Sequence, residues 1–103
     1  MAKLQSYSIT FNTTQSDADA AMSVVGSNIN NSIRNHVQSE MLLGNVTDNT
    51  ITLSDDGLTL TVERTWADSA YDELLQIATE AEIQTLINNL TTVDSATYGF
   101  SDI

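Results

Sequence analysis

Arg64, Trp66, Tyr7 and His36 are the side chains best suited to bind or transform a small molecule. Val62, Arg64 and Trp66 occupy alternate positions of one apolar segment, and alternate residues of a β-strand share a face. A guanidinium on such a face can hold an anionic ligand, or it can pair with an acidic side chain across a dimer interface. We therefore predict that the four residues form a ligand-binding site, while the sequence identifies no catalytic residue.

His36 is the only histidine, and Glu40 follows it by one helical turn. This pair can orient an imidazole for general-base catalysis, or it can be a surface contact worth about 0.2–0.5 kcal/mol. A two-histidine metal site is excluded within one chain, and cysteine ligands are absent. The run Asp55, Asp56, Gly57 lacks the spacing of a calcium loop and is typical of a turn. The sequence therefore predicts no metal site and no cofactor.

The charge of the chain restricts its partners. Fourteen acidic residues against three lysines and arginines give a formal net charge of −11. A surface this negative repels phosphate groups, so we expect no direct contact with nucleic acid or with a membrane. No secretory signal or membrane-spanning run is recognisable, and we expect a soluble, cytoplasmic protein, with association with a virion left open. The length of 103 residues predicts one domain over residues 1–103.

The first half of the chain predicts a strand followed by a helix. Apolar residues alternate with serine and threonine over residues 3–11, the pattern of a half-buried strand. A stripe of apolar residues at helical spacing predicts one long helix over about residues 17–43, capped by Ser16 and ended by Gly44. Gly26 weakens this helix, which we explain by a close approach to another backbone, the sheet for instance.

The middle of the chain predicts a β-hairpin. Over residues 50–66 apolar residues alternate with polar ones, and Asp56 and Gly57 supply the positive-φ conformations of a tight turn. Alternation at residues 96–103 predicts a last strand.

A second helical segment lies between the hairpin and the last strand. Asp68 or Ser69 is expected to cap it, and the apolar stripe rotates half-way along. Thr79 and Glu82 have the spacing of a capping box, so we predict two helical pieces with a bend near Thr79.

The order strand, helix, strand, strand, helix, strand predicts a ferredoxin-like βαββαβ fold of the α+β class. In this fold four antiparallel strands form a sheet, and the helices cover one of its faces. We expect the other face to be covered by a second copy in a homodimer, because large exposed apolar patches are rare on monomers. The side chains predicted to face that partner are Leu58, Leu60, Val62, Trp66, Tyr7, Ile9 and Phe11.

Residues 60–74 resemble the junction between the third strand and the second helix of the dimeric α+β-barrel proteins. Trp66 stands where that superfamily often ends the strand with tryptophan, and Ala70 where the helix opens with alanine. The superfamily includes the antibiotic-biosynthesis monooxygenases and the haem-degrading monooxygenases. The resemblance implies two ferredoxin-like protomers that pair sheet to sheet and enclose a barrel.

Haem-degrading members combine the junction tryptophan with a first-strand asparagine and a histidine of the second helix. This chain has no histidine in the second predicted helical segment, so haem is not expected. The first strand offers Gln5 and, just past its end, Asn12 for the asparagine position, and the sequence does not decide between them.

Three functional classes fit these observations. The first is an acidic barrel dimer that binds a small ligand. The second is a non-enzymatic structural or accessory protein of a phage or a marine microbe, and the third is an acidic decoy that mimics nucleic acid. The residues favour a protein without catalytic activity, and the one reaction they leave open is a cofactor-independent, monooxygenase-like oxygenation, in which the substrate supplies the reactive carbanion.

Overall fold

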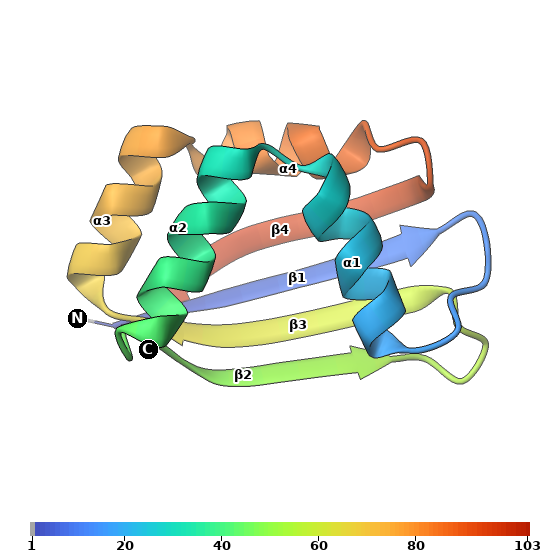
Figure 1. Cartoon of the computed structure of the whole chain (residues 1–103), viewed down its shortest axis with the longest axis horizontal. Helices are drawn as coiled ribbons and strands as arrows, with labels where there is room; N and C mark the ends of the chain where they lie inside the picture. The colour runs from blue at the N-terminus through green and yellow to red at the C-terminus, as the bar shows by residue number, and fades with distance from the viewer. Residues whose placement is uncertain (1) are drawn as a thin grey trace.

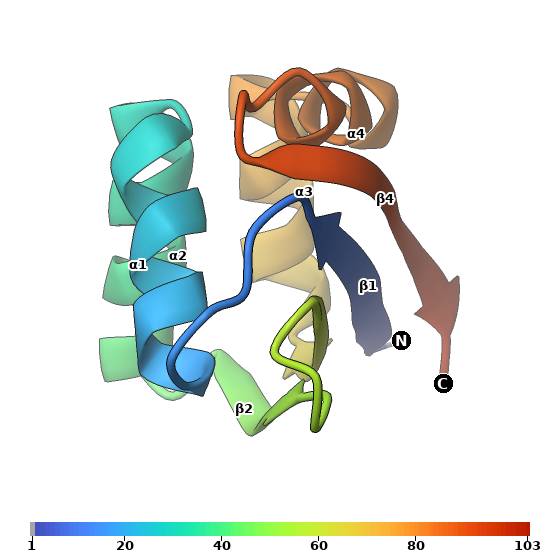
Figure 2. The same cartoon turned by 90° about the vertical axis from the view of Figure 1, so that its right-hand side faces the viewer.

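The computed structural model describes residues 2–103 and contains one sheet covered by helices. The strands pair antiparallel in the order β2-β3-β1-β4, and the helices lie on one face of the sheet (Figures 1 and 2). This is the predicted ferredoxin-like fold, and each helical crossover is divided into two helices, as predicted for the second crossover but not for the first. The elements are β1 (Lys3–Phe11), α1 (Ala18–Asn28), α2 (Asn31–Leu42), β2 (Val46–Leu53), β3 (Thr59–Trp66), α3 (Asp68–Ile77), α4 (Glu80–Asn88) and β4 (Val93–Asp102).

The core lies between the sheet and the helices. Alternate side chains of the two central strands are buried there, among them Ile9 of β1 and Leu60 and Val62 of β3. The intervening positions, such as Thr61 and Glu63, are exposed on the other face. Burial of this apolar face is the main favourable contribution to folding.

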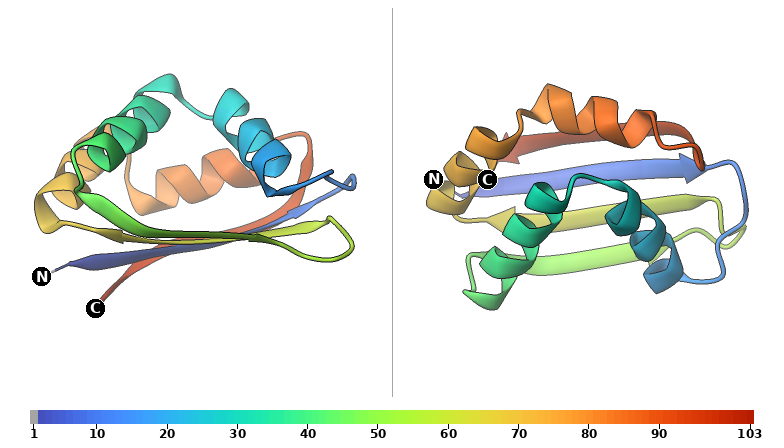
Figure 3. Two further views of the ribbon diagram at one scale, coloured as in Figure 1. Left: turned by 60° about the horizontal axis from the view of Figure 1, so that its bottom comes forward. Right: turned by 45° about the horizontal axis from the view of Figure 1, so that its top comes forward.

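This arrangement corrects the predicted role of the apolar strand residues. They do not face a partner, because the helices cover them (Figure 3). Alternating apolar residues indicate a strand with one covered face, but they do not indicate whether helices or a second sheet cover it. Here the apolar sides of the helices pack against this face. The buried residues of the predicted interface are Tyr7, Ile9, Phe11, Leu60, Val62 and Trp66, whereas Leu58 is half-buried just before β3.

The prediction of one long first helix is wrong. The chain is extended at Ile29, and Asn30 caps a new helix by accepting a hydrogen bond from the Ser32 backbone N–H at 2.7 Å. Asparagine is a poor residue inside a helix and a good one at its N-cap, which explains the break. Asp17, rather than Ser16, caps α1 by accepting from the Ala20 N–H at 2.8 Å.

Gly26 does not serve the predicted approach to the sheet. A Cβ atom there would meet only Arg34 Cδ, at an ordinary contact distance of 3.7 Å. Arg34 Nη1 donates to the Gly26 carbonyl at 3.1 Å, which joins α2 to the last turn of α1. A cation at a helix C-terminus is favourable, so Arg34 holds the two helices together across the break. Gly44 follows the predicted pattern, with a positive φ of 80° directly after the C-cap of α2.

The second crossover bends where the sequence predicts. Thr79 Oγ1 accepts from the Glu82 N–H at 3.2 Å and begins α4, which confirms the N-cap of the predicted capping box, while the Glu82 carboxylate accepts from the Thr79 hydroxyl at 3.2 Å. Neither predicted cap begins α3, because Ala67 occupies the N-cap position and makes no side-chain hydrogen bond there. None of the helices formed by residues 2–103 is both long and apolar enough to cross a bilayer.

Two strands begin earlier than predicted. β2 begins at Val46, and Asp48, with a φ of 50°, lies where the pairing with β3 shifts register. β4 begins at Val93 rather than near residue 96. In the hairpin turn Gly57 alone has a positive φ, of 72°, whereas Asp56 does not, contrary to the prediction.

Candidate functional site

A cavity of about 650 Å³ lies between the inner face of the sheet and the helices. This volume is within the range of small-molecule sites. Side chains of α1 and α2 form one wall, which is apolar at Met22, Val25 and Ile33 and also carries polar groups, among them Asp19, Arg34 and Gln38. Polar groups of the sheet form the opposite wall, and they are Gln5, Tyr7, Asn49, Arg64 and Tyr98.

Arg64 is the central group of this polar wall. Its side chain is only 6% exposed, and its Nε donates to Asn49 Oδ1 at 2.7 Å. Nη1 lies 3.4 Å from Gln5 Oε1, and the guanidinium carbon lies 5.7 Å from the centre of the Tyr7 ring. Within residues 2–103 no carboxylate forms an ion pair with Arg64. The cavity wall therefore carries a buried positive charge whose protein partners are neutral, which is costly unless a ligand compensates it.

Gln5 links the cavity to Trp66. Its Oε1 accepts from Trp66 Nε1 at 3.1 Å, and its Nε2 donates to the Tyr98 hydroxyl at 2.9 Å. Asn12, the other candidate from the sequence, lies beyond β1 and donates to the Thr91 carbonyl at 2.7 Å. The structure thus places Gln5 beside the junction tryptophan. Gln5 lies two positions before Tyr7, and this spacing was the signal that could have identified it.

Trp66 and His36 lie beside the cavity rather than in its lining, as far as residues 2–103 define it. Trp66 is fully buried and stacks on His36, with ring centres 6.0 Å apart. His36 is half-buried, and its Nε2 lies 3.0 Å from the carbonyl oxygen of Ala70 in α3. The four predicted site residues therefore form two pairs, with Tyr7 and Arg64 at the cavity and Trp66 with His36 next to it.

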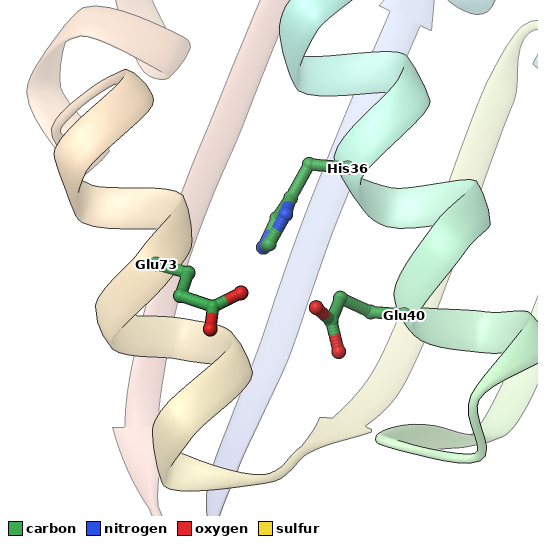
Figure 4. Close-up of side chains that lie close together, drawn as sticks. All are labelled: His36, Glu40 and Glu73. Carbon is green, nitrogen blue, oxygen red and sulfur yellow. The ribbon is translucent and has the colours of Figure 1, made fainter.

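Besides Glu40, the carboxylate of Glu73 lies close to His36, in the space between α2 and α3. Figure 4 shows the carboxylates of Glu40 and Glu73 directed toward the imidazole. The sequence pairs His36 with Glu40 because both lie on one helix, but it gives no sign of Glu73. Glu73 comes from α3, and only the packing of the two helices brings it there.

The tyrosines near the cavity hold their protons tightly. Burial raises the pKa of Tyr7, although the Arg64 charge opposes this, and burial also raises the pKa of Tyr98. Outside the cavity, the hydrogen bond from the Tyr71 hydroxyl to Glu80, at 2.6 Å, is the main cause that raises the pKa of Tyr71 to about 12. At neutral pH Tyr7 and Tyr98 can donate hydrogen bonds to a ligand, but they are not bases.

Because the pKa of Tyr71 is raised, the stability of the fold should vary with pH in the alkaline range. The unfolded chain loses this proton near the ordinary pKa of 10.0, whereas the folded protein keeps it until about 12. The free energy of unfolding should therefore fall as pH rises through this interval, and Tyr71→Phe should remove part of the fall. Urea denaturation at a series of alkaline pH values measures it, with Ser69→Ala as an exposed control on α3. The same pH dependence in wild type and Tyr71→Phe would contradict the prediction.

Comparison with known proteins supports the fold. No family model matches the sequence, and no curated protein matches it significantly. Several solved structures are similar over nearly the whole chain. One is the monooxygenase ActVA-Orf6 of Streptomyces coelicolor in complex with nanaomycin D, with 13% identity, a TM-score of 0.53 and coverage of 99% of this chain and 87% of that one.

A dimeric ferredoxin-like protein from an uncultured marine organism has 12% identity and a TM-score of 0.55, over 99% of this chain and 90% of that one. A protein from Shewanella oneidensis has 17% identity and a TM-score of 0.54, over 97% of this chain and 88% of that one. The chain has a ferredoxin-like fold. The resemblance seen at residues 60–74 is thereby confirmed at the level of fold, which is what similarity at these identities shows.

Proposed function

We propose that the cavity binds a small, mostly apolar molecule that carries one anionic oxygen group, such as an aromatic carboxylate or an acidic phenol. The observation that carries this proposal is Arg64, a buried guanidinium in the cavity wall that no carboxylate of residues 2–103 neutralises. A hydrogen bond to a charged group is worth about 1.5–3 kcal/mol, more than one between neutral groups. An anion at this place would gain that energy and relieve the buried charge.

Part of the remaining lining suits the apolar part of such a ligand. Met22, Val25 and Ile33 line the same cavity as Arg64, so the apolar part of a molecule can pack against them while its anionic group lies at the guanidinium. The guanidinium has five N–H donors, of which one donates to Asn49 and another to Gln5, so Arg64 has capacity for a ligand oxygen. The ferredoxin-like monooxygenase solved with nanaomycin D supports the proposal in general terms, because it is a protein of this fold in complex with a small molecule.

Binding, rather than catalysis, is the activity that the cavity supports. Tyr7 and Tyr98 remain protonated at neutral pH and cannot accept a proton from a substrate. His36 is the one imidazole of the chain, and it lies outside the cavity lining. Cofactor-independent oxygenation stays a prediction for substrates that form a carbanion themselves.

Calorimetric titration with a matched pair of ligands tests the proposal. Naphthoic acid and its uncharged amide have nearly the same shape, so their difference reports the charge. We expect the acid to bind about tenfold to a hundredfold more tightly than the amide, and Arg64→Met to abolish this preference. Lys3→Met is the control, because it removes the same charge at a position that pairs with Asp102 at the sheet end. Equal binding of acid and amide, no binding of either, or an unchanged preference in Arg64→Met would contradict the proposal.

We also propose that two copies pair through the face of the sheet that the helices leave uncovered. The central residue of this open face is Ser8, which lies opposite Thr61 on β3 and Thr97 on β4. These side chains are small, so a second sheet can approach closely, and they can form hydrogen bonds across an interface. The ferredoxin-like protein from the marine organism is dimeric, which supports the proposal.

Light scattering at micromolar concentration tests this pairing. We expect twice the mass of the chain for the wild type and the mass of one chain for Thr61→Arg, which places a bulky charge at the centre of the open face. Ser39→Arg on the exposed side of α2 is the control and should leave the dimer intact. A wild-type mass of one chain would overturn the dimer but not the ligand proposal, since the cavity lies within one chain.

A further inference from the structure

We propose that His36, Glu40 and Glu73 form a binding site for one divalent transition-metal ion, such as Zn²⁺ or Co²⁺. Each residue offers one ligand atom, and these atoms lie within 4.8 Å of one another. An ion about 2.0–2.2 Å from each ligand holds such atoms roughly 3–4 Å apart, so small side-chain rotations suffice to close the site. Figure 4 shows that the three groups point into the same space between α2 and α3.

The charges around the cluster favour a cation. Glu40 is 6% exposed, and its Oε2 accepts a hydrogen bond from Asn45 Nδ2 at 2.7 Å, a neutral partner. A buried carboxylate normally requires a positive partner, and here a second carboxylate lies beside it.

The basic side chains of the chain are committed elsewhere. Lys3 pairs with Asp102, Arg34 donates to the carbonyl of Gly26, and Arg64 binds Asn49 in the cavity wall. These three are all the lysines and arginines of the sequence. The two carboxylates of the cluster therefore have no lysine or arginine beside them, and a bound cation would balance their charge.

The surroundings hold the ligands in place. The ring of His36 stacks on the fully buried Trp66, and its Nε2–H donates to the Ala70 carbonyl at 3.0 Å, which fixes the ring and leaves Nδ1 as the nitrogen that can bind the ion. Asn45 orients the Glu40 carboxylate in the same way. Such outer contacts strengthen metal sites. Glu73 is exposed, so the ion would be reachable from solvent and would keep open positions for water.

The donor set indicates the class of metal. One imidazole nitrogen and two carboxylate oxygens suit Zn²⁺, Co²⁺ and Mn²⁺, whereas Mg²⁺ and Ca²⁺ prefer oxygen ligands alone. The site is therefore distinguishable from the general attraction of cations to an acidic protein. It is also independent of the cavity, because none of the three residues belongs to the cavity lining defined by residues 2–103.

The fluorescence of Trp66 provides a local readout. Trp66 is the only tryptophan, and its ring lies 6.0 Å from that of His36, so paramagnetic Co²⁺ bound to His36 should quench it. We expect saturable quenching with one Co²⁺ per chain, reversed by Zn²⁺ but not by an equal concentration of Mg²⁺. His36→Gln and Glu73→Gln should each weaken Co²⁺ binding by at least about tenfold, since even outer contacts are worth that much.

Asp94→Asn is the matched control, because it removes one exposed acidic charge away from the cluster. It should bind Co²⁺ as the wild type does. Glu73→Gln changes an exposed side chain, so its circular dichroism spectrum and unfolding midpoint should stay unchanged. Quenching that does not saturate, that Mg²⁺ reverses equally well, or that persists unchanged in His36→Gln and Glu73→Gln would overturn the proposal.

Discussion

Replacing Trp66 with alanine is expected to lower the free energy of unfolding by about 3–5 kcal/mol. The ring is fully buried, with His36 stacked at 6.0 Å and Phe100 edge-on at 5.7 Å. Its truncation leaves a void at the β3–α3 junction and removes the hydrogen bond to Gln5. A domain of this size has a total stability of about 5–15 kcal/mol, so the loss is a large part of it. Urea denaturation followed by circular dichroism measures the change.

Leu42→Ala is the control for Trp66→Ala. Leu42 is 90% exposed at the end of α2, so its truncation should change the free energy of unfolding by no more than about 0.5 kcal/mol. Trp66→Phe should fall between wild type and Trp66→Ala, because the smaller ring keeps much of the packing but not the hydrogen bond. A midpoint for Trp66→Ala equal to that of Leu42→Ala would show that the ring contributes nothing to the core.

The fold was predictable because its signals are local. Period-two alternation identifies β1 and β3, and the spacing of Thr79 and Glu82 places the bend between α3 and α4. The break at Asn30 was also a local signal, but the continuous apolar stripe concealed it. Alternation could not say whether helices or a second copy cover the apolar face, because both would bury the same residues.

The candidate site was only partly predictable, because its parts come from separate elements. Arg64 is visible in the sequence as a charge at an apolar position, and the structure places it in a cavity wall. Gln5 is a polar residue at a core position, and its role depends on the register that sets it beside Arg64 on β3. Glu73 reaches His36 through the packing of α3 against α2, which no spacing within either helix indicates.

Arg64→Met is expected to raise the free energy of unfolding of the ligand-free protein by about 1–4 kcal/mol. Removing one partner of a buried ion pair usually destabilises, because the other charge is left alone. Here Arg64 has no carboxylate partner within residues 2–103, so its removal leaves no buried charge behind. Methionine fills a similar volume and can pack against the apolar side chains that also line the cavity, such as Val25 and Ile33.

Asn49 and Gln5, which lose the hydrogen bonds from Arg64 in Arg64→Met, can still form other hydrogen bonds. Asn49 is exposed and becomes hydrated, while Gln5 retains its hydrogen bonds to Trp66 and Tyr98. Urea midpoints at an unchanged m-value measure the gain in stability, and Lys3→Met should show little change. A loss of about 3–5 kcal/mol in Arg64→Met would instead reveal a charge that the protein itself compensates. A gain would identify Arg64 as a residue kept at the expense of stability, as expected where its positive charge serves an anionic ligand.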